Sequence, residues 1–339
     1  MLNRVSLLLF LYALTWPAVS KEACPQGKPQ LIIYHAGSLS TAFKAVADLY
    51  TKQSGVCVED VAGGSVSLAR KLSAGKQAGD LYAGADDQVI EQLLKPAGYA
   101  DYSIRFAAGA MVLAYTSNSR HAGTIAAAGS NFSPPQAIPA AAADWYLQLT
   151  RPGVSFSGSH PFLDPGAYRA DMIFQLAQAH YGVANLYDDL LSHYVISRDH
   201  GGLGSAFDYQ FTYEHSALAA YKADKTGTYR YLRLPDEINL GAPALDSFYA
   251  KHAITLPGLQ SPGAAATARI PASRVTWGIT LMNDAPNREH ALAFLQLLFS
   301  PEGTAILNEF GPAALNPPRV SEQDFARLPA ALKALVQLR

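Results

Sequence analysis

The sequence predicts an α/β fold with two lobes, the first of them built on a parallel sheet. Three strand-then-helix units follow one another between residues 30 and 94, a pattern typical of a parallel sheet. Each of these strands ends in small or polar residues, and a binding crevice is expected where the carboxyl ends of such strands meet. The length of 339 residues exceeds one typical core, so two lobes are expected.

Short apolar runs rich in β-branched residues predict the strands, and apolar residues at helical spacing predict the helices between them. Strands are expected at residues 30–34, 56–61, 80–85, 111–116, 154–157, 207–213, 229–234 and 275–281. Helices are expected after the first three strands and at residues 145–149, 167–181, 287–299 and 301–310. We expect residues 21–110 to form lobe 1, residues 111–299 to form lobe 2, and residues 300–339 to pack back on lobe 1.

The charge balance limits the possible partners. The chain has 26 Lys and Arg against 27 Asp and Glu, a formal net charge of −1, and 49% hydrophobic residues. This composition is too apolar for a disordered chain. Phosphate backbones require a clear excess of Lys and Arg, so no nucleic-acid partner is expected.

The first 20 residues read as a secretory signal peptide. Arg4 precedes an apolar run over residues 5–14, and Ala18 and Ser20 supply small side chains at positions −3 and −1 of a cut after Ser20. The alternative is a membrane anchor, but the apolar run is shorter than the roughly 20 residues that a span needs. The sequence therefore predicts export to the periplasm.

The chain has two cysteines, Cys24 and Cys57. An exported protein meets an oxidising compartment, in which disulfides persist. Cys24 lies just before the first predicted strand and Cys57 lies in the second, and these strands are often neighbours in such sheets. We expect a Cys24–Cys57 disulfide, the alternative being two free thiols.

Two turns after strands, at residues 36–38 and 63–65, place a serine where a helix begins. A helix N-terminus offers unpaired N–H groups and a partial positive charge, so each turn can bind an oxyanion without a basic side chain. One such serine alone is an ordinary helix cap, but two at adjacent strand ends would face one crevice. The chain contains no Walker-type phosphate loop, no GxGxxG, no HExxH and no GxSxG elbow.

A family resemblance is spread over nearly the whole chain. The segments that carry it include His35-Ala-Gly-Ser-Leu-Ser40, Gly64-Ser65, residues 80–86 and 111–116, Asp164-Pro165 with Tyr168-Arg169, Tyr213-Glu214, residues 234–240, Trp277-Gly-Ile-Thr and Pro301-Glu302-Gly303. In this order and spacing they resemble the periplasmic molybdate/tungstate-binding proteins of ABC importers, most of all the tungstate-type branch. The resemblance implies a type II periplasmic binding fold with a mixed, mostly parallel sheet flanked by helices in each lobe, a ligand cleft between the lobes, no cofactor, and an ABC permease as partner. We expect a monomer.

The resemblance also implies a set of ligand-binding residues. Two acids match family positions that, in the tungstate-type branch, coordinate the metal of the bound oxyanion. The glycine of the first acid's turn is displaced by one position here, and alignment of the second needs a short insertion. The candidate set is Ser38, Ser65, Gly37, Gly64, Tyr168, and the two metal-coordinating acids Asp164 and Glu214.

Carboxylates would select the ligand as well as bind it. A carboxylate in contact with a bare oxyanion is repelled by on the order of a few kcal/mol in a partly screened cleft. Contact becomes favourable when the carboxylate coordinates a metal centre that can expand its shell, as tungsten and molybdenum can and sulfur cannot. Asp164 and Glu214 would thus discriminate against sulfate, unless both are ordinary surface acids.

Other functions remain open at this point. The same receptor fold could take another small anion, namely sulfate, phosphate or an organic acid. An exported hydrolase could use Ser38 or Ser65 as nucleophile, although no positioned histidine accompanies either. A binding lobe could also serve a sensor. In the favoured hypothesis the lobes close on molybdate or tungstate about hinge strands near residues 111–116 and 275–281.

Overall fold

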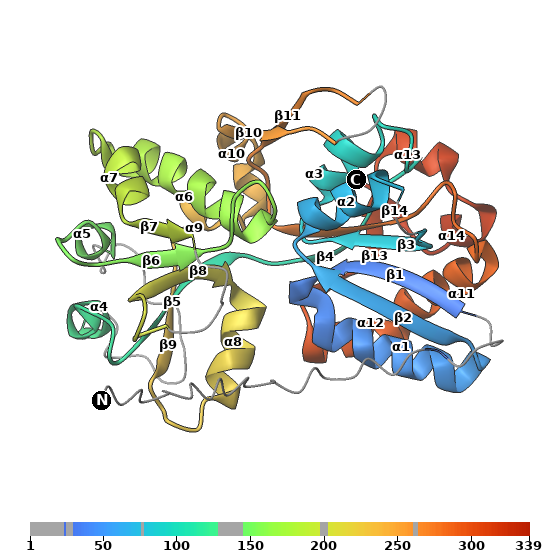
Figure 1. The fold of residues 1–339 in the computed structure, drawn as a ribbon, viewed down its shortest axis with the longest axis horizontal. Helices are drawn as coiled ribbons and strands as arrows, with labels where there is room; N and C mark the ends of the chain where they lie inside the picture. The colour runs from blue at the N-terminus through green and yellow to red at the C-terminus, as the bar shows by residue number, and fades with distance from the viewer. Residues whose placement is uncertain (1–23, 25–29, 76–77, 128–144, 197–202, 260–263) are drawn as a thin grey trace, which may run out of the picture.

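The computed structural model describes residues 24, 30–75, 78–127, 145–196, 203–259 and 264–339. The predicted signal peptide lies outside the described residues. Two sheets with their flanking helices form two lobes side by side, and the chain runs from the first lobe to the second and back (Figure 1). The predicted α/β architecture is thereby confirmed.

The first lobe is built on a seven-stranded sheet in the order β14-β13-β4-β12-β3-β1-β2. Its strands are β1 (Gln30–Ala36), β2 (Cys57–Gly63), β3 (Leu81–Gly84), β4 (Ile104–Ala108), β12 (Thr276–Leu281), β13 (Ala313–Val320) and β14 (Gln337–Leu338). The first three strands are parallel, as the three strand-then-helix units predict, whereas β12 pairs antiparallel with both β3 and β4.

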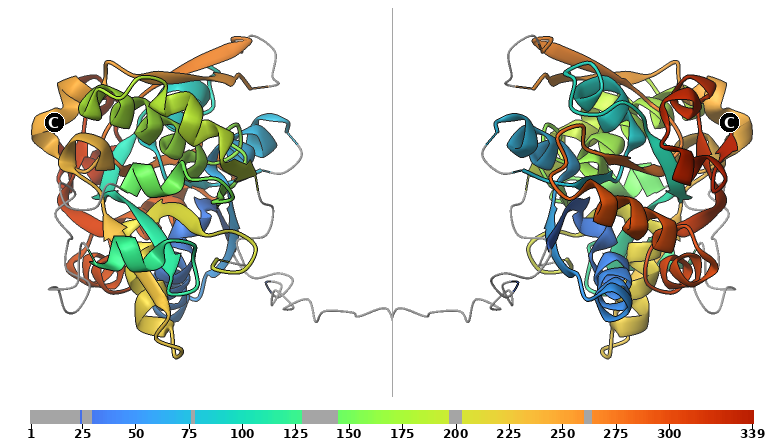
Figure 2. Two further views of the ribbon diagram at one scale, coloured as in Figure 1. Left: turned by 90° about the vertical axis from the view of Figure 1, so that its left-hand side faces the viewer. Right: turned by 90° about the vertical axis from the view of Figure 1, so that its right-hand side faces the viewer.

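Helices cover both faces of this sheet. They are η1 (Gly37–Leu39), α1 (Ser40–Ser54), α2 (Ser65–Ser73), α3 (Asp87–Val89), η2 (Ile90–Leu94), α11 (Arg288–Leu298), α12 (Pro301–Phe310), α13 (Glu322–Arg327) and α14 (Ala330–Lys333). Helix α1 buries Phe43, Val46 and Tyr50 on one face and ends at Gly55, whose φ of 73° suits a glycine. The right-hand view of Figure 2 shows α1 in blue beside the C-terminal helices in orange and red.

The second lobe is built on a five-stranded sheet in the order β7-β6-β8-β5-β9. Its strands are β5 (Met111–Thr116), β6 (Phe156–Gly158), β7 (Tyr194–Ile196), β8 (Tyr209–Tyr213) and β9 (Tyr229–Arg233). Its helices are α4 (Ala122–Ala127), α5 (Trp145–Leu149), α6 (Pro165–Tyr181), α7 (Leu186–Ser192), α8 (Glu214–Ala223), α9 (Asp236–Asn239), η4 (Pro243–Leu245) and α10 (Asp246–Tyr249). Edge-to-face contacts join Phe211 to Trp145, Phe156 and Phe174 in its core.

The chain passes between the lobes at two neighbouring places. It leaves the first lobe between β4 and β5, where the Gly109 N–H donates to the Val275 carbonyl at 3.0 Å. It returns just before β12, where the Val275 N–H donates to the Leu240 carbonyl of the second lobe at 2.7 Å. The antiparallel pair β10 (Ala253–Pro257) and β11 (Thr267–Pro271) precedes this return, and β10 contacts α6 while β11 contacts η2.

The expected lobe boundary at residue 299 comes too late in the chain. Strand β12 lies inside the first sheet and α11 packs on α1, so residues 276–298 belong with the first lobe. All six residues of β12 are buried, and an apolar run of this kind indicates a buried strand without indicating its sheet.

The predicted disulfide joins Cys24 to Cys57. Strands β1 and β2 are parallel neighbours with Gln30 opposite Cys57, so the bridge lies at the start of β2. No helix within the described ranges is long and apolar enough to cross a membrane.

Candidate functional site

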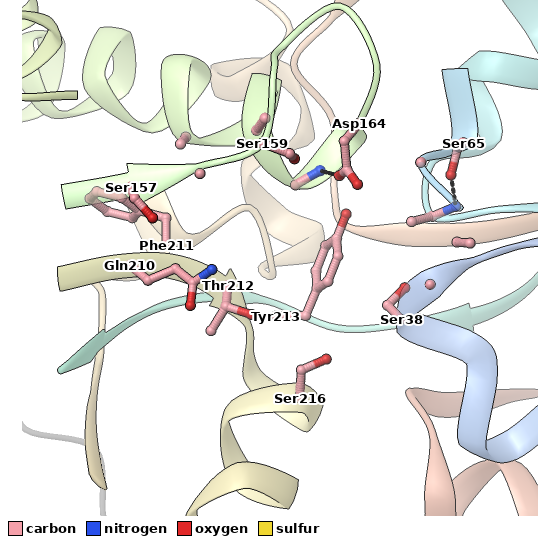
Figure 3. A pocket seen from close by; sticks show the side chains of 18 of the residues that line it. Ser38, Ser65, Ser157, Ser159, Asp164, Gln210, Phe211, Thr212, Tyr213 and Ser216 are labelled. Carbon is pink, nitrogen blue, oxygen red and sulfur yellow. Dashed lines mark hydrogen bonds between the residues drawn. The ribbon is translucent and has the colours of Figure 1, made fainter. Parts of the chain in front are cut away.

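A cavity of about 540 Å³ lies between the two lobes. The first lobe contributes Ala36, Gly37, Ser38, Gly63, Gly64, Ser65 and Ala85, and the second contributes Ser157, Gly158, Ser159, Asp164, Gly166, Ala167, Ala170, Tyr194, Leu203, Gln210, Phe211, Thr212, Tyr213, Ser216, Ala220 and Tyr229. Figure 3 shows the hydroxyl-bearing side chains facing the cavity from both sides. Among the described lining residues there is no Lys or Arg, and the single acid is Asp164.

Helix N-termini converge on this cavity. Helix α2 begins at Ser65, α6 begins directly after Asp164, and α8 begins directly after Tyr213. The first N–H groups of a helix have no acceptor within the helix and carry a partial positive charge. Three helix starts from two lobes therefore direct their partial positive charge toward the cavity, an arrangement that can bind a small anion without a basic side chain.

The two predicted serines line the first-lobe wall with their hydroxyl groups oriented by the protein. Trp277 Nε1 donates to Ser38 Oγ at 3.0 Å, and the Ala85 N–H donates to Ser65 Oγ at 3.0 Å. A hydroxyl that accepts one hydrogen bond still has its own hydrogen to give. Both serines can thus act as donors to an anion in the cavity.

Asp164 lies where the two lobes touch. Its Oδ1 accepts the Gly166 N–H at 2.6 Å and so caps α6, as Figure 3 shows. Its Oδ2 lies 3.4 Å from the position that a Cβ on Gly64 would occupy, so the carboxylate faces the start of α2 across the cleft. One carboxylate therefore sits between two helix N-termini, where negative charge is favoured.

The segment before α6 rests on α2 and keeps the cleft closed. The Ser67 N–H donates to the Leu163 carbonyl at 3.2 Å. Arg70 donates to the Phe162 carbonyl at 2.7 Å and to the Pro257 carbonyl at 2.8 Å. These bonds join the first lobe to the second across the mouth of the cavity, so the structure has the closed form of the cleft.

Two residues of the predicted set do not line the cavity. The Glu214 carboxylate pairs with Arg233 of β9 and is not among the residues that line the cavity. Tyr168 is fully buried in α6 and donates to Asp86 Oδ2 at 2.8 Å. Gly37, Ser38, Gly64, Ser65 and Asp164 are the predicted residues that the structure brings together.

Most of the cavity wall in the second lobe was not predicted from the sequence. This part of the wall includes Ser157, Ser159, Gln210, Thr212, Tyr213 and Ser216. Ser157 and Ser159 follow the same pattern as the two first-lobe turns, with small and polar residues at the end of a strand. Gln210 and Thr212 alternate with aromatic residues along β8, which marks a strand with two different faces. Both signals were present in the sequence.

His215 joins the lobes beside Ser38. Its Nε2 lies 3.1 Å from the Ser38 carbonyl oxygen, and its ring packs against Tyr213 and Trp277. His215 therefore contacts the carbonyl oxygen of Ser38, while the hydroxyl oxygen of Ser38 accepts a hydrogen bond from Trp277. A Ser–His pair of the kind that activates a nucleophile is not formed at Ser38.

Burial lowers the pKa of His215, although its hydrogen bond to Ser38 acts in the opposite direction. The unfolded chain then binds more protons than the folded protein as the pH falls through about 6.5, the ordinary histidine value. Folding stability should therefore decrease on acidification, and His215→Gln should reduce this decrease. Unfolding temperatures of the two proteins at about pH 7.5 and 5.5 test the expectation, since the other histidines are common to both. Equal losses on acidification would contradict it.

Two lobes that close over a cavity lined by helix N-termini and hydroxyl groups define a solute-binding protein of the type II periplasmic class. The sequence model for the bacterial extracellular solute-binding proteins matches residues 31–312. The chain belongs to this family.

Its relatives are consistent with the resemblance seen in the sequence. The molybdate/tungstate-binding protein WtpA of Pyrococcus abyssi (strain GE5 / Orsay) is 32% identical over 348 aligned residues, which cover 93% of this chain and 92% of the relative. Among solved structures, the Azotobacter vinelandii periplasmic molybdate-binding protein matches with a TM-score of 0.55 at 15% identity, covering 85% of this chain and 99% of that one. The sulfate-binding protein SubI of Mycobacterium tuberculosis H37Rv matches with a TM-score of 0.57 at 15% identity, covering 91% and 94%. At these identities the two solved structures show the fold alone, while the WtpA relative confirms the predicted family.

Proposed function

We propose that this protein is an exported receptor that captures molybdate or tungstate between its lobes and delivers it to an ABC permease. The observation that carries the proposal is the closed cavity, which has three helix N-termini and two serine hydroxyls but no described basic side chain in its wall. This arrangement suits one small dianion. The identity of the anion is taken from the WtpA relative, which is a molybdate/tungstate-binding protein.

Asp164 favours a metal oxyanion over sulfate. Its carboxylate lines the cavity, where it would repel a bound dianion unless it coordinates the central atom. Tungsten and molybdenum can accept an additional oxygen ligand, and sulfur cannot. The proposal assigns this contact to Asp164 and leaves Glu214 out, because Glu214 is paired with Arg233.

Export after removal of a signal peptide is part of the same proposal. Cleavage after Ser20 would release the chain into the periplasm, where a solute receptor meets its ligand before the ligand reaches the permease. The Cys24–Cys57 disulfide suits that oxidising compartment.

Calorimetric titration of anion-free protein tests the proposal. Tungstate and molybdate are expected to bind and to raise the unfolding temperature, while sulfate at the same concentration produces no comparable response. Phosphate is a useful further anion, because a protonated phosphate can donate a hydrogen bond to Asp164. A response to sulfate, phosphate or an organic acid, with none to tungstate or molybdate, would overturn the proposed function.

Asp164→Asn should weaken tungstate binding by about 10-fold or more, which corresponds to at least about 1.4 kcal/mol. The amide removes the charge and the strong metal ligand but keeps an oxygen that can cap α6, so folding should be little affected. Discrimination between tungstate and sulfate should fall at the same time, since the repulsion of sulfate is lost. Titrations of the variant with both anions provide the measurement. Unchanged tungstate affinity would remove Asp164 from the proposal.

A further inference from the structure

A buried ion pair crosses between the lobes directly behind the cavity wall. Arg169 of α6 has no exposed surface, and Asp86, which follows β3 in the first lobe, is 1% exposed. Arg169 Nη2 lies 3.2 Å from Asp86 Oδ2, and Nη1 donates to the Ala85 carbonyl of the first lobe. Neither charged side chain lines the cavity, so the pair belongs to the contact between the lobes.

The pair depends on closure of the cleft. Although burial lowers the pKa of Arg169, the Asp86 carboxylate raises it, and the net shift is upward, so the guanidinium keeps its charge. A buried charge that loses its partner is strongly unfavourable, whereas a charge that opens to water is not. The closed cleft therefore requires both members of the pair, and the open cleft requires neither.

Arg169 also controls a hydroxyl group that faces the cavity. Its Nη1 donates to the Tyr213 hydroxyl oxygen at 3.1 Å, and its guanidinium carbon lies 5.6 Å from the centre of the Tyr213 ring. Burial raises the pKa of Tyr213, so the hydroxyl keeps its hydrogen. Because the oxygen accepts from Arg169, that hydrogen must point elsewhere. In Figure 3 the hydroxyl points toward Asp164, on the cavity side.

We propose that Arg169 is a positioning residue, which directs the Tyr213 hydroxyl hydrogen toward Asp164 and the cavity and is held in place by Asp86 of the opposite lobe. Closure adds the Asp86 contact that fixes Arg169, and with it the orientation of the Tyr213 hydroxyl, and this couples capture of the anion to closure. Only the identity of the anion used in the tests rests on the proposed function.

Asp86→Asn tests the pair, and the neighbouring Asp87 offers a matched control. Asp87 is also fully buried and also pairs with an arginine, but its partner Arg105 lies in the same lobe, at 2.6 Å from Asp87 Oδ2. Asp86→Asn should weaken tungstate binding by about 10-fold and speed release, because one charge of the pair is left uncompensated in the closed form. Asp87→Asn should lower the unfolding temperature and leave affinity within about twofold. Equal losses of affinity in both variants would indicate a general effect on stability and overturn the proposal.

A double-mutant cycle tests the step through Tyr213. If Arg169 acts by positioning this hydroxyl, removing the hydroxyl with Tyr213→Phe removes part of what Asp86 contributes. The loss of tungstate affinity in Asp86→Asn/Tyr213→Phe should then be smaller than the product of the two single losses. Losses that multiply would show that the two residues act independently and overturn the positioning role.

Hydrogen exchange without any anion separates this inference from the proposed function. The Ser67 N–H donates across the cleft to Leu163, so protection at the start of α2 reports closure. The peptide containing Ser67 should exchange faster in Asp86→Asn than in the unaltered protein, with Asp87→Asn unchanged. Equal exchange in all three proteins would overturn the interlobe pair as a determinant of closure. Absence of tungstate and molybdate binding in the unaltered protein would instead overturn the proposed function, and the exchange experiment would still decide on the pair.

Discussion

Gly64→Ala is expected to weaken tungstate binding by roughly 10- to 100-fold while leaving the fold intact. A Cβ at this position would lie 2.5 Å from the Leu163 carbonyl oxygen, a backbone atom of the opposite lobe. No side-chain rotation relieves such a contact, so the Leu163 backbone and the start of α2 must move apart by up to about 1 Å. The Ser67–Leu163 hydrogen bond, the Arg70 bonds and the cavity itself all depend on that approach.

The same substitution should have little effect on the folding of either lobe. Gly64 has φ −68° and ψ 130°, which any residue adopts without strain. Gly123→Ala is the matched control, because a Cβ there meets nothing within 4 Å. Titration with tungstate and thermal unfolding without anion provide the two measurements. An affinity of Gly64→Ala close to that of the control would mean that contact between Leu163 and α2 is not needed for capture.

Replacing both cysteines with serine is expected to cost about 3–4 kcal/mol of unfolding free energy, from the loop-closure entropy of a 33-residue separation. The bridge ties the segment before β1 to β2, which is the edge strand of the seven-stranded sheet. An edge strand has a partner on one side only, so the bond from Cys24 adds a covalent restraint to the first residue of this strand.

The disulfide should matter for stability and not for binding. Cys57 begins β2 and the cavity residues follow its far end at Gly63, roughly 20 Å away along an extended strand. Denaturant unfolding of the double serine variant and of the reduced protein should give similar losses, and tungstate affinity at a temperature where both are folded should change by less than about twofold. A variant as stable as the disulfide-bonded protein would contradict the expectation.

The parts of the fold that could be predicted are those encoded by neighbouring residues. The run at residues 30–34 corresponds to β1, and the small residues after it correspond to the turn that carries Ser38 into the cavity. Ser65 follows from the same rule one unit later. Local patterns suffice here because a parallel strand, its turn and its helix are consecutive, and the carboxyl edge of the sheet then gathers the turns without further information.

The positions of the Asp164 and Glu214 side chains could not be predicted from the neighbouring sequence. Asp164 and Glu214 both stand at the start of a helix, and the family resemblance assigns both of them to the metal of the bound oxyanion. The structure separates them, because Asp164 caps α6 at the contact between the lobes while Glu214 turns to Arg233 on the neighbouring strand β9. Which way a side chain faces at a helix start depends on what packs against that turn, and the packing partner is remote in sequence.

The sequence by itself determined the three parallel units, the two serine turns, the disulfide and the family. These follow from periodicity, from turn chemistry and from segments whose order is specific. Only the tertiary structure placed β12 in the first sheet, brought Tyr213 to the cavity wall and set Arg169 against Asp86 of the other lobe. Each of these three depends on contacts between residues more than 40 positions apart. Two of the contacts form within one lobe and the third forms between the lobes, and none of them leaves a pattern in the neighbouring sequence.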